Sequence, residues 1–332
     1  MEPLPHLDDL LSRVHLVSLL MRVRFRGVSV REALLLEGPH GWGEFSPFLE
    51  YADDEAARWL SSAIAAGWQQ GPTPVRDEVP VNATVPAVVP SQVADVLARF
   101  DGCRTAKVKV AEAGQTLADD VARVAEVRAL MGPDARIRVD ANGAWSVDDA
   151  VQALAALAPY DLEYAEQPCA TLEELGAARV ALARAGIDVL VAADESIRKA
   201  EDPLAVAAAG SADVVVVKVA PLGGVAAALE VASACGLPVV VSSALDTSVG
   251  IASGVALAAA LPSLPFACGL GTVGLFERDV ASLALRPAGG VLSVAAARAV
   301  EPDRLAECAA SPDRRDWWLA RLARCYEVLR GV

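Results

Sequence analysis

The sequence predicts an α/β protein in which a (β/α)8-type (modified TIM) barrel, residues 81–286, follows a small α+β domain. Three observations support this. Eight short segments rich in Val, Ile or Ala begin every 22 to 34 residues from about residue 80. Segments of helical length separate most of them, and this alternation is typical of βαβ units with a parallel sheet. Runs such as 214–217 are apolar at every position, as in strands covered on both faces.

The first 80 residues have a different pattern and are predicted to form the α+β domain. Residues 14–30 alternate arginine with apolar residues and are predicted to be one strand. A turn-rich segment, Gly-Pro-His-Gly-Trp-Gly-Glu-Phe-Ser-Pro at 38–47, comes next. A helix is then predicted over about 53–67.

The remaining elements follow in chain order. The eight predicted strands are 81–87, 103–110, 137–141, 162–168, 189–196, 214–220, 238–244 and 266–273. Helices are predicted between them, for example over 117–131, 147–157 and 172–185. Eight units in about 200 residues favour a closed barrel over an open doubly wound sheet. From about residue 287 the chain is predicted to leave the barrel, to return in part to the first domain, and to end in a helix around 314–329.

Composition excludes several classes of function. The formal net charge of −14 argues against binding to nucleic acid or to an anionic membrane surface. The thirty uncharged residues 247–276 contain five glycines and two prolines, so a buried helix between strands explains them better than a membrane span. Asp8 and Asp9 have the wrong charge for a signal peptide. Six scattered cysteines indicate a reducing compartment, so we expect a cytoplasmic protein. No obligatory protein partner is evident.

Three acidic residues occur where consecutive barrel strands end. Asp140, Glu166 and Asp194 are separated by 26 and 28 residues, one βα repeat each time. The C-terminal ends of barrel strands form the active site, so these carboxylates are predicted to converge. Three such charges close together require a cation, and an all-oxygen ligand set favours Mg²⁺ or Mn²⁺. The alternative is that each acid caps the helix that follows it.

Lysine is rare in this chain, which has four lysines among 29 basic residues: Lys107, Lys109, Lys199 and Lys218. Lys107 and Lys109 are two residues apart on the second strand and therefore share a face. Lys218 ends the sixth strand, which is opposite the second in a ring of eight. Unlike arginine, lysine can lose its proton when its pKa is lowered, so Lys109 and Lys218 are candidates for proton chemistry. The alternative is structural pairing with the carboxylates, and for Lys107 both remain open.

These motifs together resemble the enolase superfamily, in its muconate lactonizing enzyme subgroup. The resemblance rests on Lys-Val-Lys, Asp-Ala-Asn, Glu-Gln-Pro, Asp-Glu-Ser and a final Lys on strands two to six. It extends to Gly-Trp-Gly-Glu-Phe-Ser-Pro at 41–47, which looks like the loop of a capping domain that closes over the substrate. Within the subgroup, Thr-Ala-Lys-Val-Lys-Val and the segment 242–250 most resemble the actinobacterial o-succinylbenzoate synthase family.

The resemblance implies a mechanism and a set of roles. Asp140, Glu166 and Asp194 would hold the metal ion, Lys109 would remove the α-proton of a small anionic carboxylate substrate, and Lys218 would stabilise the resulting enediolate. The implied reaction dehydrates 2-succinyl-6-hydroxy-2,4-cyclohexadiene-1-carboxylate to 2-succinylbenzoate in menaquinone biosynthesis. The residues expected to contact substrate or to support the ligands are Glu44, Phe45, Lys107, Asn142, Glu195, Ser243, Thr247 and Gly271.

Parts of the sequence are also compatible with three other functions. The same two lysines would support racemisation of N-succinylamino acids or epimerisation of dipeptides. A non-catalytic barrel is a further alternative, but every key position holds a competent residue. The segment 269–274 fits the dinucleotide fingerprint G-x-G-x-x-G, yet no further βαβ unit follows it, so NAD binding is rejected. A glycine-rich strand end that exposes backbone amides to a substrate carboxylate is the preferred interpretation there.

Overall fold

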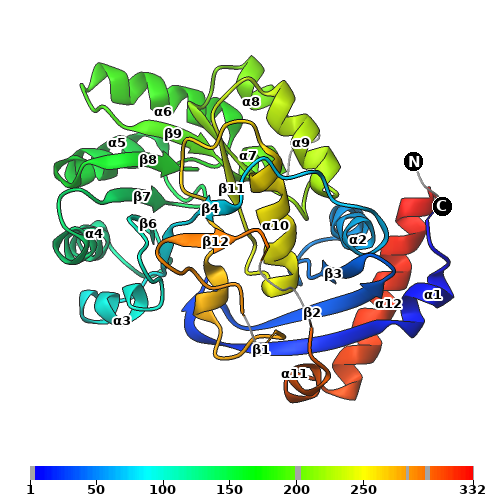
Figure 1. Cartoon of the computed structure of the whole chain (residues 1–332). Coiled ribbons are helices and arrows are strands. Elements are labelled where there is room, and N and C mark those ends of the chain that lie inside the picture. Colours follow the sequence, from blue (N-terminus) through cyan, green and yellow to red (C-terminus); the bar gives the residue numbers. More distant parts are fainter. Residues whose placement is uncertain (1–3, 199–202, 282–283, 296–299, 332) are drawn as a thin grey trace.

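The computed structural model describes residues 4–198, 203–281, 284–295 and 300–331. A curled parallel sheet of seven strands, in the order β11-β10-β9-β8-β7-β6-β5, lies at its centre (Figure 1). The strands are β5 (Ala83–Val85), β6 (Thr105–Lys109), β7 (Arg136–Asp140), β8 (Leu162–Glu166), β9 (Leu190–Ala193), β10 (Val214–Lys218) and β11 (Val239–Ser242). Neighbours in the sheet are consecutive in sequence, as βαβ units require.

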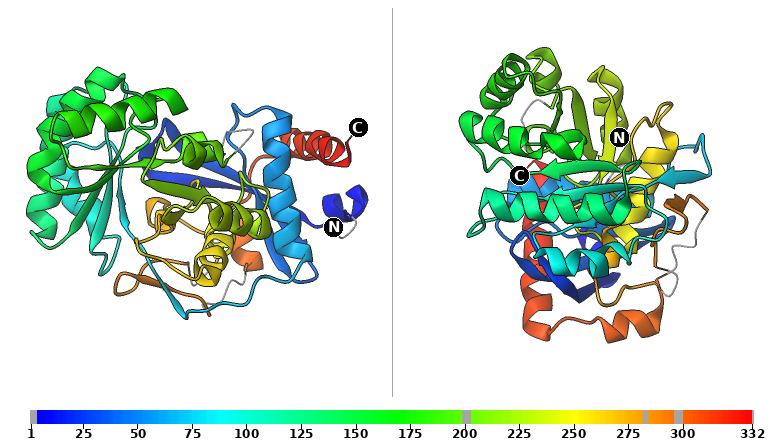
Figure 2. Two further views of the ribbon diagram at one scale, coloured as in Figure 1. Left: turned by 90° about the horizontal axis from the view of Figure 1, so that it is seen from above. Right: turned by 90° about the vertical axis from the view of Figure 1, so that its left-hand side faces the viewer.

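Helices connect these strands and lie along the outer side of the sheet, as the green and teal ribbons show (Figure 2). They are α3 (Val93–Leu97), α4 (Leu117–Met131), α5 (Val147–Leu157), α6 (Leu172–Arg184), α7 (Glu195–Arg198), α8 (Ala205–Ala208), α9 (Val225–Ala234) and α10 (Ser248–Ala260). Short 3₁₀ turns lie at Pro90–Gln92, Ala158–Tyr160 and Thr272–Leu275. Thr116 and Thr171 begin α4 and α6 with capping boxes, which satisfy the first free amides of each helix.

The predicted eighth strand, 266–273, is not a regular strand in the structure. It contributes isolated parallel bridges, Val81 with Cys268 and Ser242 with Gly269, before the 3₁₀ turn at Thr272–Leu275. Asn82 N donates to Cys268 O at 2.9 Å, and Gly269 N donates to Val241 O at 2.8 Å. This segment therefore bonds to both edges of the sheet. A Cβ at Gly269 would lie 2.5 Å from the hydroxyl oxygen of Ser242, so glycine permits this close approach, and glycine weakens regular strand structure.

The N-terminal part contains an antiparallel sheet with the order β1-β2-β3. Its elements are α1 (Leu7–Ser12), β1 (Val14–Phe25), β2 (Val28–Gly38), β3 (Gly41–Phe45) and α2 (Asp53–Trp68). The prediction of one strand over 14–30 is wrong, because the chain reverses at Arg26 and Gly27, both with positive φ. Such a two-residue turn joins hairpin strands, and arginine is an unusual residue for it.

Glycine positions bring this sheet close to α2. A Cβ at Gly43 would lie 1.9 Å from the carbonyl oxygen of Ala63, so no larger residue fits there. The chain end returns to the same region with α11 (Pro302–Glu307) and α12 (Pro312–Arg330), and α12 packs against α2. β4 (Glu78–Pro80) and β12 (Val291–Ser293) form a separate antiparallel pair. Within the described residues, no helix is both long and apolar enough to cross a bilayer.

The inner side of the parallel sheet holds its own small core. Tyr164, Ala192, Val214, Val216 and Val240 form a separate buried cluster with Phe266 packed against it. The guanidinium of Arg138 lies 4.6 Å from the centre of the Tyr164 ring. On β7, β8 and β10 this layer lies two residues before the strand-end side chains of the predicted site, so it forms the floor beneath them.

Candidate active site

The three predicted carboxylates lie at neighbouring strand ends. Asp140 ends β7 and is in register with Glu166 at the end of β8, and Asp194 directly follows β9. Each is 1% exposed. The side chains of Ser146 and Thr171 cap α5 and α6, the helices that follow β7 and β8. Asp140 and Glu166 are therefore not needed as helix caps.

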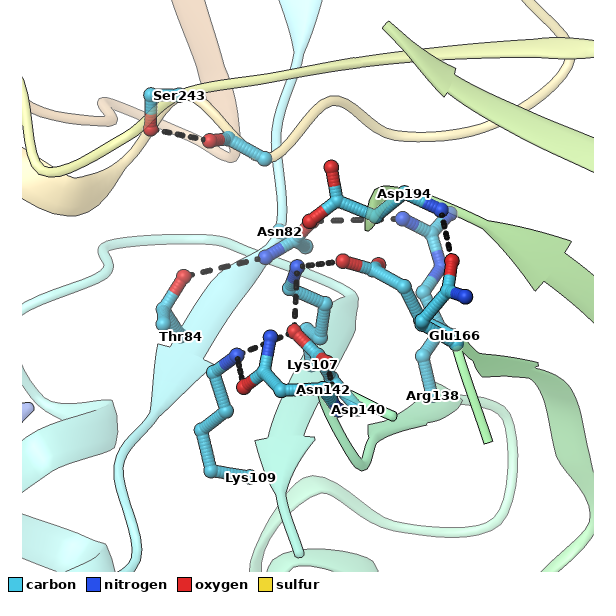
Figure 3. Close-up of polar contacts among 12 residues, drawn as sticks. Asn82, Thr84, Lys107, Lys109, Arg138, Asp140, Asn142, Glu166, Asp194 and Ser243 are labelled. Atoms are coloured by element: carbon cyan, nitrogen blue, oxygen red, sulfur yellow. Dashed lines mark hydrogen bonds and ion pairs between the residues drawn. The ribbon is translucent and has the colours of Figure 1, made fainter. Parts of the chain in front are cut away.

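The two lysines of β6 point at these acids (Figure 3). Lys107 Nζ lies 2.6 Å from Glu166 Oε1 and 3.1 Å from Asp140 Oδ2. Lys109 Nζ donates to Asp140 Oδ2 and, at 2.6 Å, to Asn142 Oδ1. Both side chains project from the same face of the strand, as their spacing of two residues predicts.

Lys218 approaches the acids from the other side. It ends β10, and its Nζ lies 2.5 Å from Asp194 Oδ2. Lys107, Lys109 and Lys218 all line one cavity. The other lining residues are Phe25, Arg26, Phe48, Thr84, Asp140, Asn142, Ser242, Ser243, Ala244, Leu245, Gly269 and Thr272.

Burial and charge perturb these groups in different directions. Burial lowers the pKa of Lys107, but the carboxylates of Glu166 and Asp140 outweigh it and raise that pKa. For Lys109 burial dominates, helped by the charge of Lys107, and its pKa is lowered. The two lysines reduce the pKa of Asp140 against the effect of its burial. Burial and the charge of Asp140 raise the pKa of Glu166 to about 7.

A divalent cation fits the chemistry of the acids, although the lysines stand among them. Within the described ranges, no three His, Cys, Asp or Glu side chains are grouped closely enough to hold a metal ion. The ammonium groups of Lys107 and Lys218 instead balance the carboxylates. Oε2 of Glu166 is nevertheless buried without a hydrogen-bond partner. Carboxylate oxygens are the ligands that a hard divalent ion prefers, so this unsatisfied oxygen is compatible with a cation bound in place of the lysine side chains.

Other polar side chains support this arrangement. Asn142 accepts from Lys109 and donates to Glu195 Oε1 at 3.2 Å, so both predicted supporting residues lie behind the lysine. Gln167, to which the sequence motifs assign no role, is fully buried. Its Oε1 accepts from the backbone amide of Asp194 at 2.9 Å and thus positions the end of β9. The sequence feature that could have identified Gln167 is its place in the Glu-Gln-Pro motif.

The predicted substrate contacts divide into two groups. Ser243 lines the cavity and donates to Gly269 O at 2.7 Å. The residues found to line the cavity do not include Glu44, Phe45, Thr247 or Gly271. Thr247 caps α10 and donates to Glu44, and Phe45 packs edge-on against a tryptophan. Gly271 lies against the backbone of Asn82, where a Cβ would be 3.2 Å from the carbonyl oxygen. As substrate contacts these four remain predictions.

The N-terminal sheet contributes residues that sequence reasoning did not place at the cavity. Phe25 and Arg26 come from the end of β1 and its turn, and Phe48 follows β3. Lys109 Nζ lies 5.1 Å from the centre of the Phe25 ring. The hairpin brings Phe25 and Arg26 to the cavity, a position that a single strand over 14–30 does not predict.

Glu44 connects the N-terminal sheet to the start of α10, and the pKa of its carboxyl group is raised. Its carboxylate accepts from the amides of Thr247 and Gly250, at 3.0 and 2.9 Å, at the start of α10. Burial and the neighbouring carboxylate of Asp246 raise its pKa from 4.5 to about 7, against the opposing charge of Arg31. The folded state therefore holds this proton over a pH range in which the unfolded chain has released it.

This linkage predicts a pH dependence of stability. Between about pH 4.5 and 7 the folded protein binds more protons than the unfolded one, so its free energy of unfolding falls as pH rises. We expect Glu44→Gln to remove this group's share of the fall, on the order of 1–3 kcal/mol. Urea unfolding of both proteins at several pH values in that range measures the slope. Equal slopes would mean that Glu44 does not titrate there.

Comparisons with known proteins identify the family of the chain. A family model described as "Enolase C-terminal domain-like" matches residues 91–301, and one described as "Enolase N-terminal domain-like" matches residues 16–67. The o-succinylbenzoate synthase of Mycolicibacterium smegmatis is 59% identical over 326 residues, which cover 98% of both chains. That of Mycobacterium marinum is 60% identical over 97% of this chain and 96% of the relative.

Solved structures share the fold at lower identity. Muconate lactonizing enzyme from Pseudomonas fluorescens superposes with a TM-score of 0.76 and 20% identity, over 90% of this chain and 98% of that one. The L-Ala-D/L-Glu epimerase of Bacillus subtilis gives a TM-score of 0.70 and 22% identity, over 84% and 94%. At such identities the likeness concerns the fold alone.

Proposed function

The chain belongs to the enolase superfamily, and on that premise we propose that it is an o-succinylbenzoate synthase, a carbon–oxygen lyase. It dehydrates 2-succinyl-6-hydroxy-2,4-cyclohexadiene-1-carboxylate to 2-succinylbenzoate, a step of menaquinone biosynthesis. The observation that carries this choice of reaction is the 59% identity to a synthase over 98% of both chains. The two-lysine cavity supports it, because this reaction needs a base and an opposing positive charge.

The positions of the lysines support the roles that the family resemblance implies. The amine of Lys109 takes the α-proton, and the electron pair of the broken C–H bond passes to the substrate carboxylate. The ammonium formed on Lys109 then protonates the hydroxyl as its C–O bond breaks, so that water leaves and the ring becomes aromatic. The ammonium of Lys218, across the cavity, stabilises the negative charge that develops on the substrate carboxylate. Asn142 orients Lys109 through the 2.6 Å hydrogen bond.

A divalent cation, Mg²⁺ or Mn²⁺, would be held by Asp140, Glu166 and Asp194. When bound it supplies a Lewis acid for the substrate carboxylate. The buried, unsatisfied Oε2 of Glu166 supports this assignment. Lys107 would then serve mainly to balance charge between Asp140 and Glu166, which its two short contacts support.

The remaining assignments concern architecture and location. We assign residues 81–286 to a closed (β/α)8-type barrel, supported by the hydrogen bonds of Cys268 and Gly269 to both sheet edges. We assign residues 1–80 and part of 287–332 to a capping domain, supported by the packing of α12 on α2. The substrate is a small carboxylate, and the scattered cysteines favour the cytoplasm.

A direct assay tests the proposal. Purified protein with Mg²⁺ is expected to convert the cyclohexadiene substrate to 2-succinylbenzoate, followed by the change in ultraviolet absorbance as the ring becomes aromatic. The same preparation is offered an N-succinylamino acid in D₂O, where racemisation exchanges the α-proton for deuterium. Absence of dehydration together with fast racemisation would overturn the synthase assignment in favour of a racemase on the same site.

A further inference from the structure

Arg31 is a buried arginine that lies behind the cavity wall. It belongs to β2 and is 4% exposed. Nε donates to the carbonyl oxygen of Leu245 at 3.1 Å, and Nη2 donates to that of Ala244 at 3.2 Å. Nη2 also donates to the carbonyl oxygen of Ser46, and the guanidinium lies 4.5 Å from the centre of the Phe48 ring. One side chain thus joins two segments that are about 200 residues apart in sequence.

Both segments form part of the cavity. Ala244, Leu245 and Phe48 line it, whereas the residues found to line it do not include Arg31. Leu245 has a φ of 61°, a left-handed backbone conformation that is unfavourable for leucine. Such a conformation persists only where its surroundings hold it, and the Nε of Arg31 binds its carbonyl oxygen.

The same connection, between β11 and α10, is held at its other end by Glu44. Its carboxylate accepts from the amides of Thr247 and Gly250, while Arg31 donates to the carbonyl groups of Ala244 and Leu245. The N-terminal sheet therefore supplies an acceptor for the free amides of this connection and a donor for its carbonyls. Ser243, which lines the cavity, precedes these anchored residues directly.

We propose that Arg31 is a positioning residue for substrate binding, which fixes the Ser243–Leu245 wall and the Phe48 side chain in the places that the substrate meets. This proposal builds on the synthase function and adds a residue that does not touch the cavity. The guanidinium suits the role because its planar set of donors reaches three carbonyl groups at once. A lysine in its place would keep the charge beside Glu44 and Asp246 but could not span all three.

The proposal predicts which kinetic constant changes. Arg31 makes no contact with β6 or β10, from which Lys109 and Lys218 project, within the hydrogen bonds of the described residues. A displaced wall weakens contacts that the substrate makes equally in the ground state and in the transition state. Loss of such uniform binding raises KM and leaves kcat nearly unchanged.

The test compares Arg31→Met and Arg31→Lys with a matched control, Arg128→Met. Arg128 also donates only to backbone carbonyl oxygens, those of Tyr160, Ala135 and their neighbours, near the opposite ends of the strands. Both Arg31 variants are expected to raise KM about tenfold with kcat within about threefold of wild type, while Arg128→Met keeps KM. If Arg31→Lys matches wild type, the role is charge balance and the proposal fails. It also fails if Arg31→Met raises KM no more than Arg128→Met.

A second measurement does not depend on activity. Amide hydrogen exchange of peptides covering 243–250 is expected to be about tenfold faster in Arg31→Lys than in wild type, and unchanged in Arg128→Met. If exchange of these peptides is as slow in Arg31→Lys as in wild type and in Arg128→Met, the proposal is overturned. This outcome decides the question even if the Arg31→Met protein does not fold. If the wild-type protein shows no dehydration at all, the synthase function has failed, and the exchange rates alone then decide whether Arg31 holds this connection.

Discussion

Lys109→Arg is expected to abolish dehydration while the protein remains folded. Arginine keeps the positive charge beside Asp140 but does not give up its proton, so it cannot act as a base. Loss of a general base lowers the rate by about 10²- to 10⁴-fold. Turnover with Mg²⁺, together with exchange of the substrate α-proton in D₂O, measures both the overall reaction and the proton-transfer step.

Lys218→Arg is the matched comparison for this experiment. Both lysines are buried, at 6% exposure, and both are paired with a carboxylate. Lys218 is assigned a role of charge alone, which arginine can supply, so this variant is expected to retain more activity than Lys109→Arg. A near-normal rate for Lys109→Arg would show that Lys109 is not the base. Equal and complete loss in both variants would show that Lys218 also transfers a proton.

Removal of divalent cations is expected to abolish turnover, and Mg²⁺ is expected to restore it. In the structure Lys109 is paired with Asp140 and Lys218 with Asp194. A divalent ion held by Asp140, Glu166 and Asp194 would compete with these lysine side chains for the carboxylate oxygens, and it would supply a Lewis acid for the substrate carboxylate. Without that Lewis acid, the negative charge formed when the α-proton is removed loses a stabilising interaction.

Two readouts check this expectation. Protein treated with EDTA is assayed during titration with Mg²⁺, and its melting temperature is measured at the same Mg²⁺ concentrations. A ligand that binds only the folded state raises the melting temperature. Asp194→Asn is expected to shift both titrations to higher Mg²⁺ concentration. Full turnover by protein whose metal content is far below one ion per chain would contradict the assignment of Asp140, Glu166 and Asp194 as ligands.

The strand-end residues could be predicted from the sequence because the βα repeat is local. Each apolar run and the polar residue that ends it lie next to each other in the chain, so Lys109, Asp140 and Glu166 needed only the repeat and the rule that strand ends converge. The structure confirms that they lie together, with Lys218 on the same cavity.

The contacts made by the N-terminal sheet could not be predicted in this way. Glu44 and Thr247 are 203 residues apart, and no periodic pattern connects them. The turn at Arg26 lacks the usual Asn-Gly signal, so the sequence does not predict the hairpin that brings Phe25 to the cavity. The segment 266–273 looked like a strand by hydrophobicity, yet its glycines leave it with isolated bridges.

The small core beneath the strand ends has a consequence for the solvation of the site. Tyr164, Val216 and the rest of that cluster are buried, with Phe266 packed against them, and they form the floor of the site. Water is therefore excluded on this side of the carboxylates and lysines, so their charges act on one another through protein rather than through solvent.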